Sequence, residues 1–99
     1  MTRYLETLQA HARLTILRLL DEAPRYTSNV SMLTQLMHPY GITYTRDQVT
    51  TEVHWLKEQG FVSTEDHNGF IIVTATARGI EIAHGIATHP GVQRPRPGA

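Results

Sequence analysis

The segment that decides the fold runs from residue 44 to residue 76 and reads YTRDQVTTEVHWLKEQGFVSTEDHNGFIIVTAT. Thr45 can accept a hydrogen bond from the open amides of a first helical turn, and Gln48 can reach back to the amide of residue 45. Gly60 supplies the left-handed conformation that ends many helices. We therefore expect a helix over residues 45–59.

The expected helix has an apolar side and a polar side. Val49, Val53 and Leu56 recur at spacings of four and three, which places them on one stripe. Trp55 lies off this stripe, where packing in the core or in a dimer is favoured over stacking on a base. The opposite side carries Arg46, Thr50, Thr51, His54, Lys57 and Glu58. We expect the apolar stripe to pack and the polar side to be available to a partner.

A β-hairpin is expected directly after this helix, over residues 61–76. The segments FVSTED and FIIVTAT are rich in Phe, Ile, Val and Thr, which are typical strand residues. Asn68-Gly69 lies between them and favours a type I′ turn, because that turn needs a positive φ at both central residues.

The first helix of the chain is expected over residues 3–22, where Pro24 closes it. Its apolar arc is wide and comprises Leu5, Leu8, Ala12, Leu14, Ile16, Leu17, Leu19 and Leu20. This width fits either a second contact surface, on another protomer or on the C-terminal helix, or a larger share of the domain core.

Two shorter helices complete the expected elements. One follows candidate N-caps at residues 27–29 and stops at residues 38–39, after which Ile42 is expected to supply a small strand. The other covers residues 77–87 after a cap at Thr76. Its two glycines, at positions 79 and 85, cost about 1 kcal/mol each, so we expect it to depend on packing.

Ninety-nine residues correspond to one domain, which we place at residues 1–88, followed by a flexible tail over residues 89–99. Arg94 and Arg96 in this tail could follow DNA phosphates, dock in an acidic groove, or belong to a disordered segment.

The composition excludes several functional classes. The chain has no cysteine, and therefore neither a disulfide framework nor a thiolate. No apolar run approaches the ~20 residues of a membrane span, and the N-terminal residues lack a signal-peptide pattern, so we expect a cytoplasmic protein without membrane contact. No nucleophile has a plausible base and orienting group, and no glycine-rich phosphate loop occurs, so we expect neither an enzyme nor a cofactor.

The order of the elements, together with the segments RLTILRLLDEAP, TRDQVTTEVHWLKEQGFV and VTATARGIEIA, resembles winged-helix DNA-binding proteins of the ArsR-like kind. The chain is also similar to small proteins of Mu-like prophages. The resemblance implies an α+β winged helix-turn-helix with three helices, a two-stranded β-hairpin wing and an additional C-terminal helix. It further implies a transcription regulator of the (pro)phage type, with residues 45–59 in the major groove of duplex DNA and residues 61–76 on the backbone or minor groove. We expect a homodimer, because of the wide apolar arc over residues 5–20 and the glycines that weaken the last helix.

Nine residues are expected to contact DNA. Arg46 could bridge the acceptors of a guanine or clamp a phosphate, or instead pair with Asp47 on a wet surface. Lys57 could contact a phosphate or complement the helix dipole. The full set is Thr45, Arg46, Gln48, Thr50, Thr51, His54, Lys57, His67 and Asn68.

Two other functions fit the sequence. Nine basic and nine acidic side chains balance, and the expected wing carries Glu65 and Asp66, which favours a winged helix that binds a protein partner in phage development and no DNA. Some ArsR-like sensors bind zinc, and Glu81, His84 and His89 could supply ligands for a metal-responsive repressor. We expect no metal site, because Glu and His at this spacing are common on a wet helix.

Overall fold

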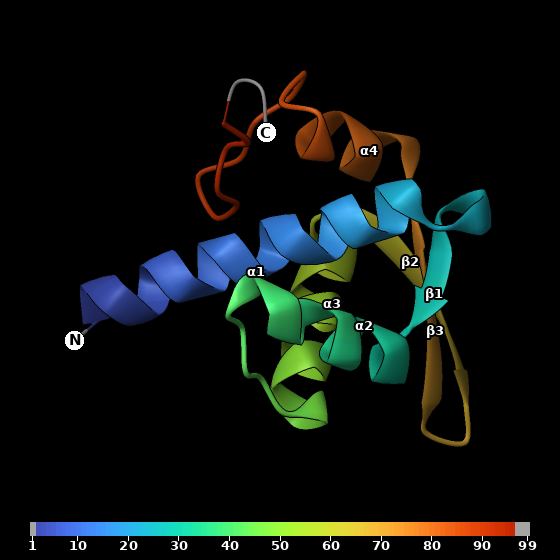
Figure 1. Cartoon of the computed structure of the whole chain (residues 1–99). Helices are drawn as coiled ribbons and strands as arrows, with labels where there is room; N and C mark the ends of the chain where they lie inside the picture. The colour runs from blue at the N-terminus through green and yellow to red at the C-terminus, as the bar shows by residue number, and fades with distance from the viewer. Residues whose placement is uncertain (1, 97–99) are drawn as a thin grey trace.

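The long helix α1, Thr2–Glu22, crosses the molecule, and the other elements pack around it (Figure 1). The computed structural model describes residues 2–96. Helices α2, Val30–Met37, and α3, Arg46–Glu58, pack on one side of α1, and α4, Ala77–Ala83, packs on the other. The 3-10 turns η1, Pro24–Tyr26, and η2, His38–Tyr40, follow α1 and α2. Residue 1 of the expected domain and residues 97–99 of the expected tail lie outside the described residues.

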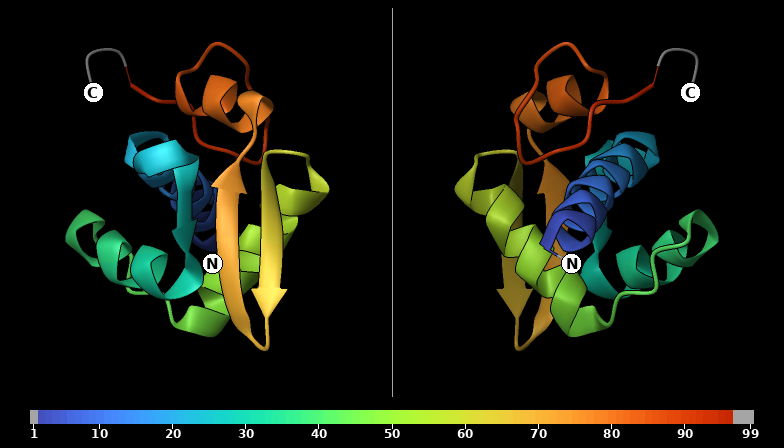
Figure 2. Two further views of the ribbon diagram at one scale, coloured as in Figure 1. Left: turned by 90° about the vertical axis from the view of Figure 1, so that its right-hand side faces the viewer. Right: turned by 90° about the vertical axis from the view of Figure 1, so that its left-hand side faces the viewer.

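A three-stranded antiparallel sheet completes this α+β architecture, with the strand order β1-β3-β2. Its strands are β1, Thr27–Asn29, β2, Val62–His67, and β3, Phe70–Ala75. The hairpin of β2 and β3 is confirmed, and its turn residues Asn68 and Gly69 have φ values of 55° and 89°. Figure 2 shows that the helices lie on one face of the sheet and that its other face is open.

The small third strand differs from the sequence prediction. We expected it at Ile42, but residues 27–29 form it by pairing with β3, in a register that sets Thr27 opposite Thr74. Ile42 instead enters the core, where only 1% of it is exposed, because Gly41 turns the chain inward at a φ of 79°. The extended conformation that makes Asn29 an N-cap also leaves residues 27–29 free to complete a strand ladder.

The predicted start and end of α3 are both confirmed. Thr45 Oγ1 accepts from the Gln48 amide at 3.2 Å, and Gln48 Oε1 accepts from the Thr45 amide at 2.8 Å. Gly60, at a φ of 80°, donates to Lys57 O, and Phe61 N donates to Leu56 O. This pair of bonds is the Schellman motif, which satisfies the last carbonyls of a helix.

Helix α4 is shorter than predicted, because it ends at Ala83 and not at residue 87. Gly85 takes a φ of 76° and donates to Ile82 O, and Ile86 N donates to Glu81 O. Gly85 therefore terminates the helix in a second Schellman motif and does not interrupt it.

The core lies between α1, the other helices and the inner face of the sheet. Packing within the chain buries five of the eight members of the wide apolar arc of α1, which are Ala12, Leu14, Ile16, Leu17 and Leu20. Tyr4 and Leu5, in the part of α1 that projects beyond the other elements in Figure 1, are 66% and 52% exposed. Among residues 2–96, no helix combines the length and apolar character needed to cross a membrane.

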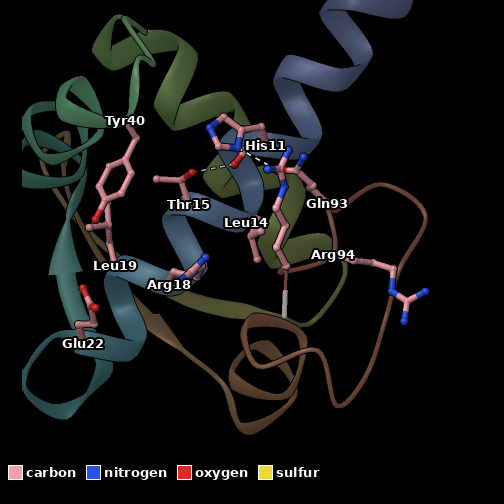
Figure 3. Close-up of a pocket in the computed structure, with 10 residues that line it drawn as sticks. His11, Leu14, Thr15, Arg18, Leu19, Glu22, Tyr40, Gln93 and Arg94 are labelled. Atoms are coloured by element: carbon pink, nitrogen blue, oxygen red, sulfur yellow. Dashed lines mark hydrogen bonds between the residues drawn. The ribbon is translucent and has the colours of Figure 1, made fainter. Parts of the chain in front are cut away.

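The segment after α4 packs against α1 at several points. Val92 is 4% exposed, so the expected tail contains an apolar side chain that the sequence analysis did not place in the core. Gln93 N donates to Ala10 O at 3.1 Å, and His11 Nδ1 donates to Gln93 Oε1 at 2.9 Å (Figure 3). The packed part of the chain therefore extends beyond residue 88.

Candidate nucleic-acid interface

The polar side of α3 faces solvent, and its apolar stripe is buried as predicted. Val49, Val53 and Leu56 are fully buried. Glu52 lies among them at 3% exposure, which the sequence pattern did not indicate. The expected DNA-contacting residues of α3 lie on the remaining surface, exposed except for the half-buried Thr50.

The polar side of α3 is divided into two parts. At 100° per residue, Arg46, Thr50 and Lys57 fall within about 40° of each other around the helix axis. We call these three residues the hairpin-side stripe, because Arg46 and Thr50 lie beside the hairpin. On the other flank of α3, Gln48 and Thr51 line a smaller hollow with Leu5 and Leu8 of α1.

The start of α3 and the hairpin tip share an open hollow of about 600 Å³. Its lining residues are Thr45, Arg46, Asp47, Thr50, Gly69 and Ile71. The structure therefore brings three of the predicted residues beside the tip of the hairpin, from separate parts of the chain.

Several predicted residues already serve the helix itself. Thr45 and Gln48 form the capping box, so their oxygens are engaged. The hydroxyl of Thr50 donates to Arg46 O at 2.8 Å, and that of Thr51 donates to Asp47 O at 3.1 Å. Both threonine oxygens can still accept hydrogen bonds from a ligand.

The two faces of the hairpin carry different residues. Asp66 pairs with Ile71 in the strand register, whereas His67 pairs with Phe70. Because side chains alternate along a strand, Asp66 shares the face of Ile71 and the hollow, and His67 lies on the opposite face. Asp66 Oδ1 accepts from Gly69 N at 2.7 Å. Strand alternation would have indicated this difference, which the prediction of His67 did not take into account.

The charge of this surface is negative. The exposed parts of α3 and the hairpin carry the cations Arg46 and Lys57 and four carboxylates, of Asp47, Glu58, Glu65 and Asp66, which gives a net charge of −2. Within residues 2–96, neither Arg46 nor Lys57 forms an ion pair. Their charges are therefore available to a partner.

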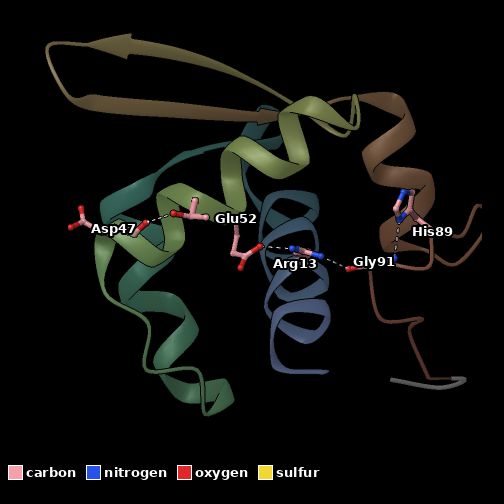
Figure 4. A network of polar contacts seen from close by, with 6 residues as sticks. Arg13, Asp47, Glu52, His89 and Gly91 are labelled. Carbon is pink, nitrogen blue, oxygen red and sulfur yellow. Dashed lines mark hydrogen bonds and ion pairs between the residues drawn. The ribbon is translucent and has the colours of Figure 1, made fainter. Parts of the chain in front are cut away.

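A partly buried polar network connects α3 to α1 and to the C-terminal segment (Figure 4). Arg13 Nε on α1 donates to Glu52 Oε1 at 2.7 Å, and Arg13 Nη1 donates to Gly91 O at 3.0 Å. The guanidinium carbon lies 3.8 Å from the ring centroid of Trp55, and the ring of His89 meets Trp55 edge-on at 5.2 Å. Trp55 thus packs within the domain, in agreement with the core interpretation.

The residues considered for a metal are engaged elsewhere. Glu81 pairs with Arg78 at 3.3 Å, and His84 Nε2 lies 2.8 Å from Asp21 Oδ2. His89 Nδ1 accepts from Gly91 N at 2.9 Å. In the described part of the chain, no three His, Asp or Glu side chains gather as a metal site would require.

Comparison with known proteins places the chain among phage and bacterial relatives. The gp26 protein of Escherichia phage Mu is 40% identical over 94 residues, which cover 95% of this chain and 97% of gp26. A protein of Haemophilus influenzae strain Rd is 35% identical over 74 residues, which cover 74% of this chain and 72% of that protein. The name of neither relative states an activity. No family model and no solved structure matches the chain.

Proposed function

The chain belongs to the family of the phage Mu protein gp26, and from this premise we propose that it is a winged-helix protein that binds duplex DNA sequence-specifically as a phage-type transcription regulator. In this proposal α3 enters the major groove, and the β2–β3 hairpin is the wing that meets the backbone or minor groove.

The hollow shared by α3 and the hairpin tip carries this proposal. In duplex DNA each groove lies between two phosphate backbones. A helix in the major groove and a wing on the adjacent backbone or minor groove must therefore lie on the same side of the protein. Arg46, Thr50 and Gly69 line one surface and meet this requirement. Arg46 can read guanine acceptors or hold a phosphate, and Lys57 further along the stripe can hold the next phosphate.

A homodimer is part of the proposal. The projecting turn of α1 exposes Tyr4 and Leu5, and Ile86 beyond α4 is 74% exposed. These apolar side chains can join two copies, and a dimer would offer two α3 helices to successive half-sites. Sedimentation equilibrium at tens of micromolar tests this, and a strictly monomeric mass for the native chain would reject it.

The proposal is tested by selection from a pool of duplex DNA that includes fragments of the source genome, read across a salt series. We expect one sequence to be enriched, with an affinity that falls as salt rises because cations on the protein displace counterions. Equal retention of all fragments would indicate backbone binding only. No retention at low salt would contradict the proposal.

A second candidate function rests on the net charge of −2 around α3 and the hairpin. DNA-binding surfaces usually carry an excess of cations, whereas carboxylates favour a basic protein segment as partner. In this alternative the same fold is a protein-interaction module of phage development. Co-purification from phage-infected cells, compared between the wild type and Asp66→Asn, tests it. A basic protein partner should no longer co-purify with Asp66→Asn, because the carboxylate that attracts it is gone. DNA should still co-purify with this variant if DNA is the partner.

A further inference from the structure

A third concave site lies on the side of α1 away from α3. Its volume is about 380 Å³, which is within the range of small-molecule sites. The α1 residues that line it are His11, Leu14, Thr15, Arg18, Leu19 and Glu22. Tyr40 closes one side and the C-terminal segment, residues 93–96, closes the other (Figure 3).

The pocket combines an apolar wall with an excess of positive charge. Arg18, Arg94 and Arg96 line it together with one carboxylate, that of Glu22. Three of the nine basic side chains and one of the nine acidic ones therefore gather at one site of a chain whose formal charge is zero. In the part of the chain that the structure describes, none of these arginines forms an ion pair.

Arg18 is the cation that α1 contributes to the pocket. In Figure 3 it lies between Leu19 and Leu14, with Tyr40 and Gln93 on the two outer sides. The side chain of Arg94 extends outward, away from His11, so Arg94 contributes mainly to the local potential. A guanidinium beside apolar side chains favours a ligand whose charged head and apolar body lie close together.

The walls are held by hydrogen bonds within the chain. His11 binds the side chain of Gln93, and the Gln93 amide binds Ala10 O. Thr15 Oγ1 donates to His11 O at 2.8 Å, which leaves its oxygen free to accept. The pocket is thus formed before a ligand arrives, which lowers the ordering cost of binding.

We propose that this pocket binds a small organic anion with an aromatic or other apolar body. Its carboxylate, sulfonate or phosphate group is held by Arg18, and its body packs on Leu14, Leu19 and Tyr40. The site lies on the face of α1 opposite to Arg13, which contacts α3, so this inference does not depend on DNA binding.

The test uses two fluorescent probes of similar shape, 8-anilinonaphthalene-1-sulfonate, an anion, and N-phenyl-1-naphthylamine, its neutral analogue. We expect saturable binding of one sulfonate per chain. Arg18→Gln should weaken sulfonate binding about tenfold, from the loss of one charge-assisted hydrogen bond, and should leave the neutral probe unchanged. Arg78→Gln, on the exposed surface of α4, is the matched control and should change neither affinity.

Equal sulfonate affinity in the wild type and Arg18→Gln would overturn the proposal. An equal loss of sulfonate affinity in Arg18→Gln and Arg78→Gln would also overturn it. If Arg18→Gln fails to fold by circular dichroism, Tyr40→Ser takes its place, because Tyr40 is 55% exposed and its loss does not open the core. That variant should weaken both probes, and unchanged binding would reject the site. Amide shifts of the wild type on titration should centre on residues 11–19 and 93.

Discussion

Arg13 on α1 and Glu52 on α3 form an ion pair of 2.7 Å, with only 14% and 4% of their side chains exposed. The same guanidinium donates to Gly91 O and stacks on Trp55. One arginine therefore joins the first helix, the candidate reading helix and the C-terminal segment.

Removal of one partner of this pair should be strongly destabilising. Glu52→Leu leaves the mostly buried Arg13 without its counter-charge, and we expect a loss of about 3 kcal/mol in the free energy of unfolding, measured by urea denaturation. The double variant Arg13→Leu with Glu52→Leu should lose less than the sum of the two single variants, because no charge is left unpaired. Strict additivity would show that the two side chains do not interact.

The sequence predicted the features that are set by neighbours along the chain. The capping box of Thr45 and Gln48 and the turn at Asn68-Gly69 were predicted because each depends on residues within one turn. The strand at residues 27–29 was missed, because its partner β3 lies more than 40 residues further along the chain.

The sequence predicted which types of residue the candidate site contains, but not how those residues are arranged. The pattern of α3 separated a polar side from an apolar one, but Glu52 looked like another polar residue until Arg13, 39 positions earlier, was found beside it. The pattern also could not show that Arg46 and Thr50 face the hairpin whereas Thr51 faces α1. Those relations depend on packing between distant segments, which periodicity does not contain.

Gly79 should not tolerate a side chain. A Cβ at this position would lie 2.1 Å from Phe61 O, a backbone atom that also accepts from Thr76 N. Gly79→Ala must displace α4 from the end of α3, and we expect a loss of about 2 kcal/mol or more in the free energy of unfolding. Thermal and urea denaturation of the purified variant measure it.

Gly69→Ala is the control for this effect. Its φ of 89° imposes backbone strain, but no atom lies within 4 Å of the added Cβ. We expect a loss of about 1 kcal/mol, smaller than that of Gly79→Ala. If Gly69→Ala were the more destabilising of the two, close packing of α4 would not be the reason for a glycine at position 79.

Tyr44 should make the fold sensitive to alkaline pH. Burial raises the pKa of its phenol, the Glu52 carboxylate raises it further, and Arg13 opposes them. A folded-state pKa above the unfolded value of about 10 means that stability is complete below that pH and is lost as pH rises through the folded pKa. As pH rises above ~10, the wild type should lose more stability than Tyr44→Phe.

The comparison for Tyr44 is Tyr4→Phe, because Tyr4 is 66% exposed. Urea denaturation at pH 8 and at higher pH should give parallel curves for the wild type and Tyr4→Phe. If Tyr44→Phe loses as much stability as the wild type at high pH, the loss of stability in alkaline solution is due to other groups.

Arg46 should matter for DNA affinity and not for folding. Its side chain is exposed and forms no ion pair within residues 2–96. Arg46→Ala should weaken binding to the selected sequence by ~1 to 3 kcal/mol with little change in thermal stability, as measured by fluorescence anisotropy and calorimetry. Arg78→Ala on α4 is the matched control and should bind normally. Unchanged affinity in Arg46→Ala would remove this residue from the interface.

Glu58→Gln distinguishes the two candidate functions by the sign of its effect. Glu58 is exposed in the last turn of α3, near Lys57, where a carboxylate repels phosphates. If the partner is DNA, neutralisation of Glu58 should raise the affinity for DNA about threefold at low salt, because roughly 0.6 kcal/mol of repulsion is removed. This gain should fade at high salt. Glu22→Gln at the end of α1 removes the same charge elsewhere and should have no such effect. If the partner is a basic protein segment, Glu58→Gln should weaken binding, because the carboxylate then attracts its ligand.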